Sequence, residues 1–255
     1  LSYVEDAKLI YKAKKLLGKN IGIISKIENK LAVKNIDEII KASDAIMVAR
    51  GDLALDVGHS EVPKIQLGII KKCNNNSKPV IVATQMLESM INNFTATRAE
   101  INDIATAIFQ GADTVMLSAE TAVGKYPVQA VKTMFKTIVS TEAYKKEHIE
   151  DFKSSIEVKR DPIKSIVLSV KDLAYNPSVK AIIAFSNSGT TAKLVSAVRP
   201  RVKIITISPN IIVSRQMSLL WGVRSIKSKD ASGWKDMINI SRQIIKKDKS
   251  IKKND

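Results

Sequence analysis

Four short apolar segments, each followed at once by polar residues, constrain the fold of this chain more than any other feature. Each segment has four or five residues, is rich in isoleucine or valine, and lacks the clean alternation of a half-exposed strand. This pattern is typical of strands that are buried on both faces, as in a parallel sheet. The predicted strands are Ile21–Ser25, Ala45–Ala49, Pro79–Ala83 and Thr114–Leu117.

Helical patterns separate these predicted strands. They cover Ala32–Ala42, Val62–Asn74 and Thr97–Gln110, and Gly111 follows the last of them in the position of a helix C-cap. Alternating strands and helices indicate βα units with right-handed crossovers. The first region of the chain is therefore predicted to be an α/β structure.

Polar side chains stand where the predicted strands end. In strand order they are Lys26 and Glu28, Asp52, Thr84, and Ser118. In a (β/α)8 barrel the active site lies at the carboxyl ends of the strands. In an open doubly wound sheet, ligands bind at the same ends. The pattern predicts an enzyme-like rim and does not choose between the two architectures.

A second α/β region is predicted after a polar linker. Residues Tyr144–Arg160 are rich in charge and poor in apolar side chains, which indicates a helix extension and a linker. The predicted domains are therefore 1–143, 144–160 and 161–255. In the last domain the predicted strands are Ala181–Phe185 and Lys203–Ile207, and the predicted helices are Ile163–Leu173, Ala192–Val198, Ile211–Leu220 and Trp234–Lys247.

The composition supports a buried core and argues against specific nucleic-acid binding. Apolar residues make up 45% of the 255 residues. The formal net charge is +16, but the lysines are spread along the chain, and 5% aromatic residues are too few for a base-stacking platform. No window reaches the roughly eighteen apolar residues of a membrane span, so no membrane is expected. Cys73 is the only cysteine, which excludes an intrachain disulfide and favours a reducing, cytoplasmic location.

Lys26, Glu28 and Asp52 form a candidate site for phosphoryl chemistry. Lys26 and Glu28 are two residues apart at a strand end, so their side chains leave the same face. Two carboxylates from adjacent strand ends suit Mg²⁺, which takes few carboxylates together with water and substrate oxygens. A nearby ammonium would neutralise charge on a transferring phosphoryl group. The same residues also fit a surface Lys–Glu pair and an ordinary Arg-Gly-Asp turn.

Three other rim features fit either a binding role or a structural one. The segment Gly51–Val57 could begin a short helix whose backbone N–H groups bind a carboxylate or phosphate, or it could be a plain turn. The hydroxyl groups of Thr84 and Ser118 could position a substrate or relay a proton, or they could cap the following helices.

Five motifs in the first region resemble the signatures of the pyruvate kinase family, in the order and at the spacing of that family. The resemblance is dense over residues 1–143 and looser beyond them. The motifs are Ile24–Asn29, Met47–Leu53, Lys78–Met90, Thr97–Glu100 and Met116–Ala122.

The resemblance implies a partial (β/α)8 TIM-type barrel followed by a smaller α/β C-terminal domain. It implies the glycolytic transfer of a phosphoryl group from phosphoenolpyruvate to ADP, giving pyruvate and ATP, by a cytoplasmic homo-oligomer. Mg²⁺ or Mn²⁺ is the implied divalent cofactor. K⁺ is expected from the family, with ligands that lie outside this chain.

The resemblance also implies roles for the rim residues. Lys26 matches a lysine that stabilises the phosphoryl group in flight, and Glu28 and Asp52 match the metal ligands. Thr84 matches a catalytic threonine that contacts the substrate, and Ser118 a catalytic serine near the route by which the enolate is protonated. The segment implied to hold the substrate carboxylate through its backbone is Ala49, Arg50, Gly51 and Asp52.

The chain departs from the family pattern at a few places. Ala54 stands where the family often has glycine, and Ala96 where it usually has proline, but neither change removes a metal ligand. Leu1–Val4 resembles the end of the fourth barrel strand of the family. We therefore expect the chain to lack the earlier strands and to be inactive, or nearly so, on its own. The alternatives are a non-catalytic remnant of a split or decayed gene, and another Mg²⁺-dependent barrel acting on phosphoenolpyruvate or pyruvate.

A short loop in the second region resembles the effector site of the family, where a phosphate group lies at a helix N-terminus. Small hydroxylated residues and a glycine suit a phosphate cradle. Ordinary strand-to-helix turns use the same residues, so both interpretations stand. The loop residues are Ser186, Asn187, Ser188, Gly189, Thr190 and Thr191.

Overall fold

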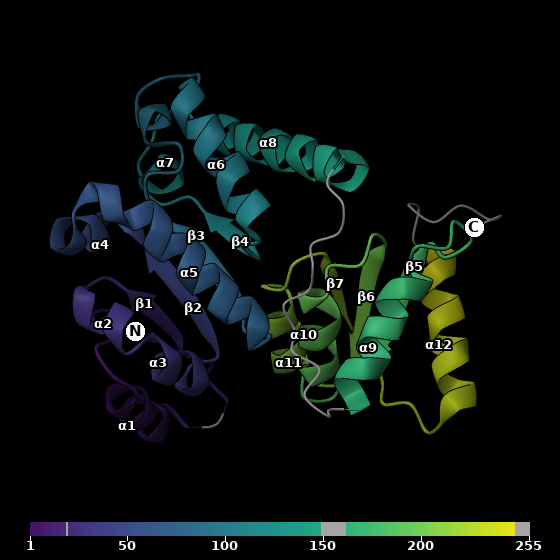
Figure 1. Ribbon diagram of the computed structural model, residues 1–255. Coiled ribbons are helices and arrows are strands. Elements are labelled where there is room, and N and C mark those ends of the chain that lie inside the picture. Colours follow the sequence, from purple (N-terminus) through teal and green to yellow (C-terminus); the bar gives the residue numbers. More distant parts are fainter. Residues whose placement is uncertain (19, 149–161, 248–255) are drawn as a thin grey trace. The chain divides into compact units, whose positions relative to one another are not determined.

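A computed structural model describes residues 1–18, 20–148 and 162–247 of the chain (Figure 1). Its contacts divide the chain into two compact units, residues 1–155 and 156–255. Both units are α/β structures with parallel sheets, as the sequence predicts. The predicted linker 144–160 overlaps the end of a helix up to residue 148, and its other residues lie outside the described part of the chain.

The sheet of the first unit has four parallel strands in the order β1-β2-β3-β4. In this sheet Ile27 pairs with Val48, and Ala83 pairs with both Ala49 and Met116. The carboxyl ends of the four strands therefore lie along one edge. The strands are β1 (Ile24–Ile27), β2 (Ala45–Ala49), β3 (Val80–Ala83) and β4 (Thr114–Met116).

Strand β1 begins at Ile24 rather than at the predicted Ile21. The residue before it, Ile23, donates its backbone N–H to the Asp44 carboxylate at 2.8 Å, and its carbonyl accepts from Asp44 N at 2.9 Å. The regular ladder starts only with the pairing of Ile24 and Ala45. The strand also ends at Ile27 rather than at the predicted Ser25, so Lys26 lies inside the strand and Glu28 is the first residue after it.

Helices connect the strands of this unit. The predicted helices 62–74 and 97–110 are present as α5 and α6, whereas the predicted helix Ala32–Ala42 is divided at Asn35. The backbone of Asn35 leaves the helical region, with φ −96° and ψ 17°, and its side-chain amide donates to the Glu5 carbonyl at 2.9 Å. The helical segments are α1 (Ala7–Leu17), α2 (Lys30–Lys34), α3 (Ile36–Ala42), α4 (Arg50–Val57), η1 (His59–Glu61), α5 (Val62–Asn75), η2 (Glu88–Ile91), α6 (Arg98–Gln110), α7 (Ala119–Ala122) and α8 (Pro127–His148).

Apolar side chains of the strands and helices form one core in the first unit. All four residues of β3 are buried, as expected for a strand covered on both faces. Burial of an Ile or Val side chain contributes about 1.5–3 kcal/mol relative to exposure, so this core dominates the stability of the unit. Fully buried members include Ile27, Ile46, Val48, Val80, Val82, Ile39, Ile70 and Ile104.

Helix α6 has defined caps at both ends. The Thr97 hydroxyl accepts from the Glu100 backbone N–H at 3.3 Å, and the Glu100 carboxylate accepts from Thr97 N at 2.8 Å. The same carboxylate accepts from Ser89 N at 2.7 Å, so the cap also fixes the preceding loop. Gly111 ends the helix in the left-handed region with φ 96°, which confirms the predicted C-cap.

The second unit has a sheet of three parallel strands in the order β5-β6-β7. β7 has no counterpart among the predicted strands, because its sequence Val-Arg-Ser-Ile-Lys contains two cations and lacks an apolar run. Helix α10 begins at Thr190 rather than Ala192, and α11 ends at Met217 rather than Leu220. The elements are α9 (Pro162–Leu173), β5 (Ala181–Phe185), α10 (Thr190–Ala197), β6 (Lys203–Ser208), α11 (Ile211–Met217), β7 (Val223–Lys227) and α12 (Trp234–Lys247).

None of the described helices combines the length and the apolar content that crossing a lipid bilayer requires.

We predict that Thr97→Ala destabilises helix α6, because the variant loses the side chain that caps the Glu100 N–H. Loss of an N-cap hydroxyl costs about 1 kcal/mol, which corresponds to roughly fivefold faster amide exchange. The measurement is hydrogen exchange of peptides covering residues 97–110. Thr106→Ala is the matched control, because among the described residues the Thr106 hydroxyl bonds only to Asn102 O, within the helix. Equal increases in the exchange rate for the two variants would contradict the capping role of the Thr97 side chain.

We predict that Glu100 stabilises the first unit above pH 4.5, its ordinary pKa, and less below it. Burial, the largest effect, acts to raise the pKa, but hydrogen bonds from Ser89 and Thr97 outweigh it, so the folded pKa is lowered. As pH falls, Glu100 is protonated first in the unfolded chain, which lowers the free energy of that state relative to the folded one. The stabilisation by Glu100 is therefore lost as pH falls through its folded pKa. Urea denaturation at about pH 6 and about pH 3 should show a larger loss for the wild type than for Glu100→Gln. An equal loss in both proteins would exclude this contribution.

Candidate functional site

Charged side chains meet at the carboxyl edge of the first sheet. Glu28 follows β1, and Asp52 lies in the first turn of α4, directly after β2. Lys26, two residues before Glu28, points to the same side and forms an ion pair with it. The predicted grouping of these three residues is therefore present at one strand rim.

Glu28 is a buried carboxylate with unequal oxygen environments. Its side chain is 1% exposed. One oxygen, Oε2, accepts from the backbone N–H of Tyr3 at 2.6 Å. The other, Oε1, makes no hydrogen bond to the described residues and is neutralised by the ammonium of Lys26. That ammonium also donates to the Ser2 hydroxyl at 3.3 Å.

The pKa of Glu28 lies below its ordinary value of 4.5. Burial is the largest effect and acts to raise the pKa, but the contact of the carboxylate with the Lys26 ammonium and the hydrogen bond from Tyr3 N together outweigh it. Smaller contributions come from the charge of Lys26 and from the Asp52 side chain, which is therefore within reach of Glu28. Glu28 is ionised at neutral pH and is available as an anionic ligand.

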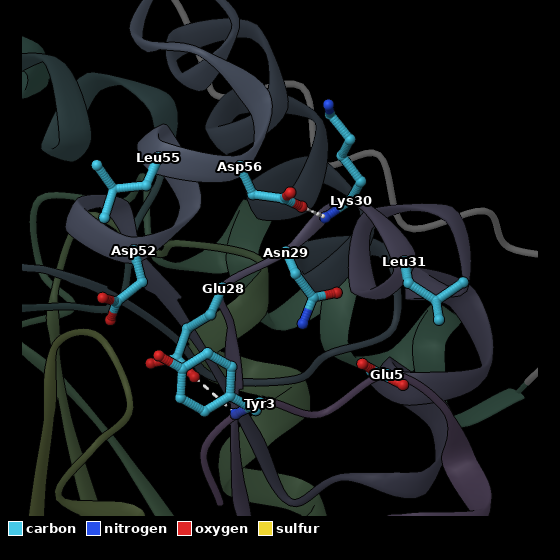
Figure 2. A pocket seen from close by; sticks show the side chains of 9 residues that line it. All are labelled: Tyr3, Glu5, Glu28, Asn29, Lys30, Leu31, Asp52, Leu55 and Asp56. Carbon is cyan, nitrogen blue, oxygen red and sulfur yellow. Dashed lines mark hydrogen bonds between the residues drawn. The ribbon is translucent and has the colours of Figure 1, made fainter.

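A cavity of about 570 Å³ opens beside these carboxylates (Figure 2). Figure 2 shows the carboxylates of Glu28 and Asp52 directed towards the same space. The Asp56 carboxylate is turned instead to the backbone of Lys30, whose N–H it accepts at 2.6 Å. The cavity is lined by Tyr3, Glu5, Glu28, Asn29, Lys30, Leu31, Asp52, Leu55 and Asp56.

Glu28 and Asp52 fit a small divalent cation. They offer carboxylate oxygens on one side of the cavity, and among the described residues the buried Oε1 of Glu28 is paired only with the Lys26 ammonium. Mg²⁺ and Mn²⁺ take such oxygen ligands. In the part of the chain that the structure describes, no three Asp, Glu, His or Cys side chains are grouped to hold a metal ion. Water and substrate oxygens would therefore have to complete the coordination.

Thr84 begins a tight turn after β3. Thr84 and Gln85 both have positive φ, 69° and 53°, although neither is glycine. Such conformations cost about 1–3 kcal/mol each and persist only where the surroundings hold them. The Thr84 hydroxyl accepts from Gly51 N at 2.9 Å and donates to Ala83 O at 2.6 Å. One backbone N–H of the predicted anion-binding segment is therefore already bound to Thr84.

Arg50 is directed into the protein and away from the cavity. Its side chain is 7% exposed and forms an ion pair with Asp103 in α6. Its guanidinium donates to the backbone carbonyls of Thr84 and Gln85. If Arg50 contacts a substrate carboxylate as predicted, the contact is therefore made by its backbone N–H and not by its side chain.

Ser118 follows β4 and is held by Glu120. Glu120 is buried, and its two oxygens accept from Leu87 N at 3.1 Å and from Ser118 N at 2.7 Å. This carboxylate therefore connects the loop after β3 to the loop after β4. Neither Thr84 nor Ser118 lines the cavity beside Glu28. The cavity brings together only the two predicted metal ligands among the candidate site residues.

Three residues that make contacts at the rim are not among the predicted site residues: Tyr3, Asp56 and Glu120. Each makes its rim contact with a residue more than twenty positions away, so local pattern does not mark it. Only Glu120 carries a signal, as an acidic residue two positions after the strand-end Ser118.

The candidate effector loop of the second unit is a strand-to-helix turn between β5 and α10. Gly189 has φ 84° and precedes the first residue of the helix, where a β-carbon would be strained. The hydroxyls of Ser188 and Thr190 bond to each other at 3.0 Å, and Ser186 is buried and pairs with Ile207.

The fold and the rim define an α/β protein made of a section of (β/α) barrel and a smaller α/β domain. The family profile described as the pyruvate kinase barrel domain matches residues 1–131, and that of the pyruvate kinase alpha/beta domain matches residues 164–255. The chain belongs to the pyruvate kinase family. The resemblance and the architecture expected from the sequence motifs are thereby confirmed.

Relatives named pyruvate kinase match nearly the whole chain. A protein of Agrobacterium vitis is 39% identical over 251 residues, which are 98% of this chain and 52% of the relative. A protein of Staphylococcus saprophyticus is 46% identical over 227 residues, covering 87% of this chain and 38% of the relative. The crystal structure of a pyruvate kinase from Cryptosporidium parvum superimposes with a TM-score of 0.89 at 33% identity, covering 96% of this chain and 52% of that one. The chain thus spans about half, or less, of the length of these proteins.

We predict that Gly124→Ala disturbs the contacts by which Glu120 connects the loop after β3 to the loop after β4. An added β-carbon would lie 2.4 Å from the Glu120 carbonyl oxygen, which is backbone and cannot move aside. Forced overpacking of this kind costs about 1–3 kcal/mol, so the thermal midpoint should fall. Gly68→Ala, in helix α5, is the matched control, because no atom of the described residues lies within 4 Å of its added β-carbon. That variant should gain about 0.4–1 kcal/mol. A stable Gly124→Ala protein would contradict the predicted clash.

Proposed function

We propose that this chain carries residues for transfer of a phosphoryl group from phosphoenolpyruvate to ADP, giving pyruvate and ATP. The observation that carries the proposal is the meeting of Lys26, Glu28 and Asp52 at one strand rim. Phosphoryl transfer demands positioning and charge neutralisation rather than covalent chemistry by the protein. An ammonium and two carboxylates in one place supply the groups for both.

Glu28 and Asp52 would hold Mg²⁺ or Mn²⁺, which neutralises and orients phosphate oxygens when bound. Lys26 lies within ion-pair reach of Glu28, so its ammonium can face the same phosphoryl group. In the proposed reaction Lys26 stabilises the negative charge that develops on this group. The burial of Glu28 keeps bulk water from weakening these interactions.

The other rim residues have secondary roles in the proposal. The backbone from Ala49 to Asp52 would contact the substrate carboxylate at the start of α4. Thr84 would contact the substrate through its hydroxyl, which Gly51 and Ala83 already orient. Ser118, which Glu120 fixes at the end of β4, would take part in the route of the proton to the enolate.

Further parts of the proposal rest on family membership. They are a cytoplasmic location, homo-oligomeric assembly, the division into domains 1–143, 144–160 and 161–255, and effector binding by the loop from Ser186 to Thr191. The positive φ of Gly189 and the small hydroxylated side chains support a phosphate cradle in that loop.

A second candidate is a non-catalytic remnant that binds at most a metal ion or a small anion. The observation that favours it is the open sheet of the first unit, in which β4 pairs with β3 alone among the described strands. A (β/α)8 barrel closes its ladder with eight strands. We therefore propose that the chain by itself has little or no turnover even where its metal site is intact.

We predict that the chain binds one Mn²⁺ ion through Glu28 and Asp52. Calorimetry with Mn²⁺ alone should show affinity at least about tenfold weaker for Glu28→Gln and for Asp52→Asn, because each variant removes an anionic ligand. Asp56→Asn is the matched control, since Asn keeps an acceptor for the Lys30 N–H and its side chain faces away from the two ligands. Equal affinity in all four proteins would end the metal assignment.

A measurement of enzymatic turnover distinguishes the catalytic chain from the non-catalytic remnant. A coupled assay with phosphoenolpyruvate, ADP, Mg²⁺ and K⁺ should show loss of at least about a hundredfold in Lys26→Met if the chain is catalytic. Mn²⁺ binding without turnover in the wild type supports the remnant. Turnover near that of an intact enzyme would refute the expectation that the chain alone has little activity.

A further inference from the structure

Arg50 is a buried cation whose hydrogen bonds converge on one turn. Its Nη2 donates to Thr84 O at 2.6 Å, to Gln85 O at 3.1 Å and to the sulfur of Met86 at 2.8 Å, while Nε donates to Thr84 O at 3.2 Å. Its Nη1 forms the ion pair with Asp103. A charge removed from water needs such partners, and the planar fork of a guanidinium can serve several of them at once.

The turn that Arg50 holds has a conformation that its own sequence disfavours. Thr84 and Gln85 both have positive φ, and Thr84 is branched at its β-carbon. With this backbone, both carbonyl oxygens lie within hydrogen-bond distance of one guanidinium. The contacts that favour this arrangement therefore come from outside the turn.

The turn in return fixes the start of the helix that carries Asp52. The Thr84 hydroxyl accepts from the N–H of Gly51, the residue directly after Arg50. Gly51 lies in the first turn of α4, where a backbone N–H has no acceptor within its own helix. Arg50 thus donates hydrogen bonds to the turn, and Thr84 in the turn accepts one from Gly51. Together these bonds set the position of the Thr84 hydroxyl relative to Asp52.

We infer that Arg50 is a positioning residue that holds the Thr84 hydroxyl at the rim by binding the carbonyl oxygens of Thr84 and Gln85. It does not line the cavity beside Glu28 and acts through Thr84. The effect on phosphoenolpyruvate rests on the proposed function, whereas the effect on Thr84 does not. Lysine cannot replace it, because one ammonium cannot reach both the turn and Asp103 in the same way.

The first test measures exchange of the Gly51 amide by NMR, with no ligand present. Arg50→Lys should speed this exchange at least about tenfold relative to helix α5, because Thr84 is no longer held. Asp103→Asn is the matched control: it removes the ion-pair charge, but the amide oxygen of Asn can still accept from Arg50 Nη1 and the turn contacts remain, so exchange of the Gly51 amide should change less than about twofold. Faster exchange throughout the first unit, or an equal effect of Asp103→Asn, would overturn the inference.

A second measurement needs no substitution and decides the case if Arg50→Lys does not fold. In the wild type, the guanidinium N–H signals of Arg50 should be individually resolved, with a coupling across the hydrogen bond from Nη2 to the Thr84 carbonyl. A single averaged signal would show that the guanidinium is free, and the inference would fail.

The third test uses Mn²⁺ and phosphoenolpyruvate as probes. Arg50→Lys should leave Mn²⁺ affinity within about twofold and weaken phosphoenolpyruvate binding at least about tenfold. In a double-mutant cycle of Arg50→Lys with Thr84→Ala, the losses of phosphoenolpyruvate affinity should not add, because Arg50 acts through Thr84. Full additivity, or a parallel loss of Mn²⁺ affinity, would contradict the inference. If the wild type binds neither probe, the proposed function fails, and the Gly51 exchange still decides the role of Arg50.

Discussion

The parallel register of β1–β4 is the constraint on which the candidate site depends. The pairing of Ile27 with Val48, and of Ala83 with Ala49 and Met116, brings the carboxyl ends of all four strands to one edge. Residues that follow different strands become neighbours there, although they are far apart in sequence. The buried apolar core fixes this register, since a shift by one residue would move the Ile and Val side chains out of the positions in which they are close-packed.

The charge at the rim is stabilised locally rather than by exposure to water. Glu28 stays ionised in a buried position because Lys26 and the Tyr3 N–H compensate for its lost hydration. Its Oε1 is paired with the Lys26 ammonium; in the proposed site a metal ion would take the place of that ammonium, which would then be free to face a phosphoryl group.

The loops of the rim are connected to one another by charged side chains, of which Arg50 and Glu120 are buried and Asp56 is exposed. Asp56 connects α4 to the start of α2, Arg50 connects the end of β2 to the turn after β3, and Glu120 connects that turn to the loop after β4. In each case a side-chain charge bonds to a backbone group, so the position of a loop depends on its neighbour across the sheet. This arrangement explains how Thr84 and Gln85 keep positive φ values.

The sequence by itself determined the fold class, the strands Ala45–Ala49 and Ala181–Phe185, the C-cap of α6, and the meeting of Lys26, Glu28 and Asp52. These follow from local periodicity and from the position of a residue relative to its own strand end. Only the tertiary structure decided the start of β1, the division of the helix at Asn35, the edge strand β7, and the inward direction of Arg50. Each of these depends on a partner elsewhere in the fold: the Asp44 carboxylate, the Glu5 carbonyl, the neighbouring strand β6 and the turn at Thr84. Hydrogen bonds between residues as far apart as 34 positions, as for Arg50 and Thr84, leave no periodic trace in the chain, and so only the folded arrangement reveals them.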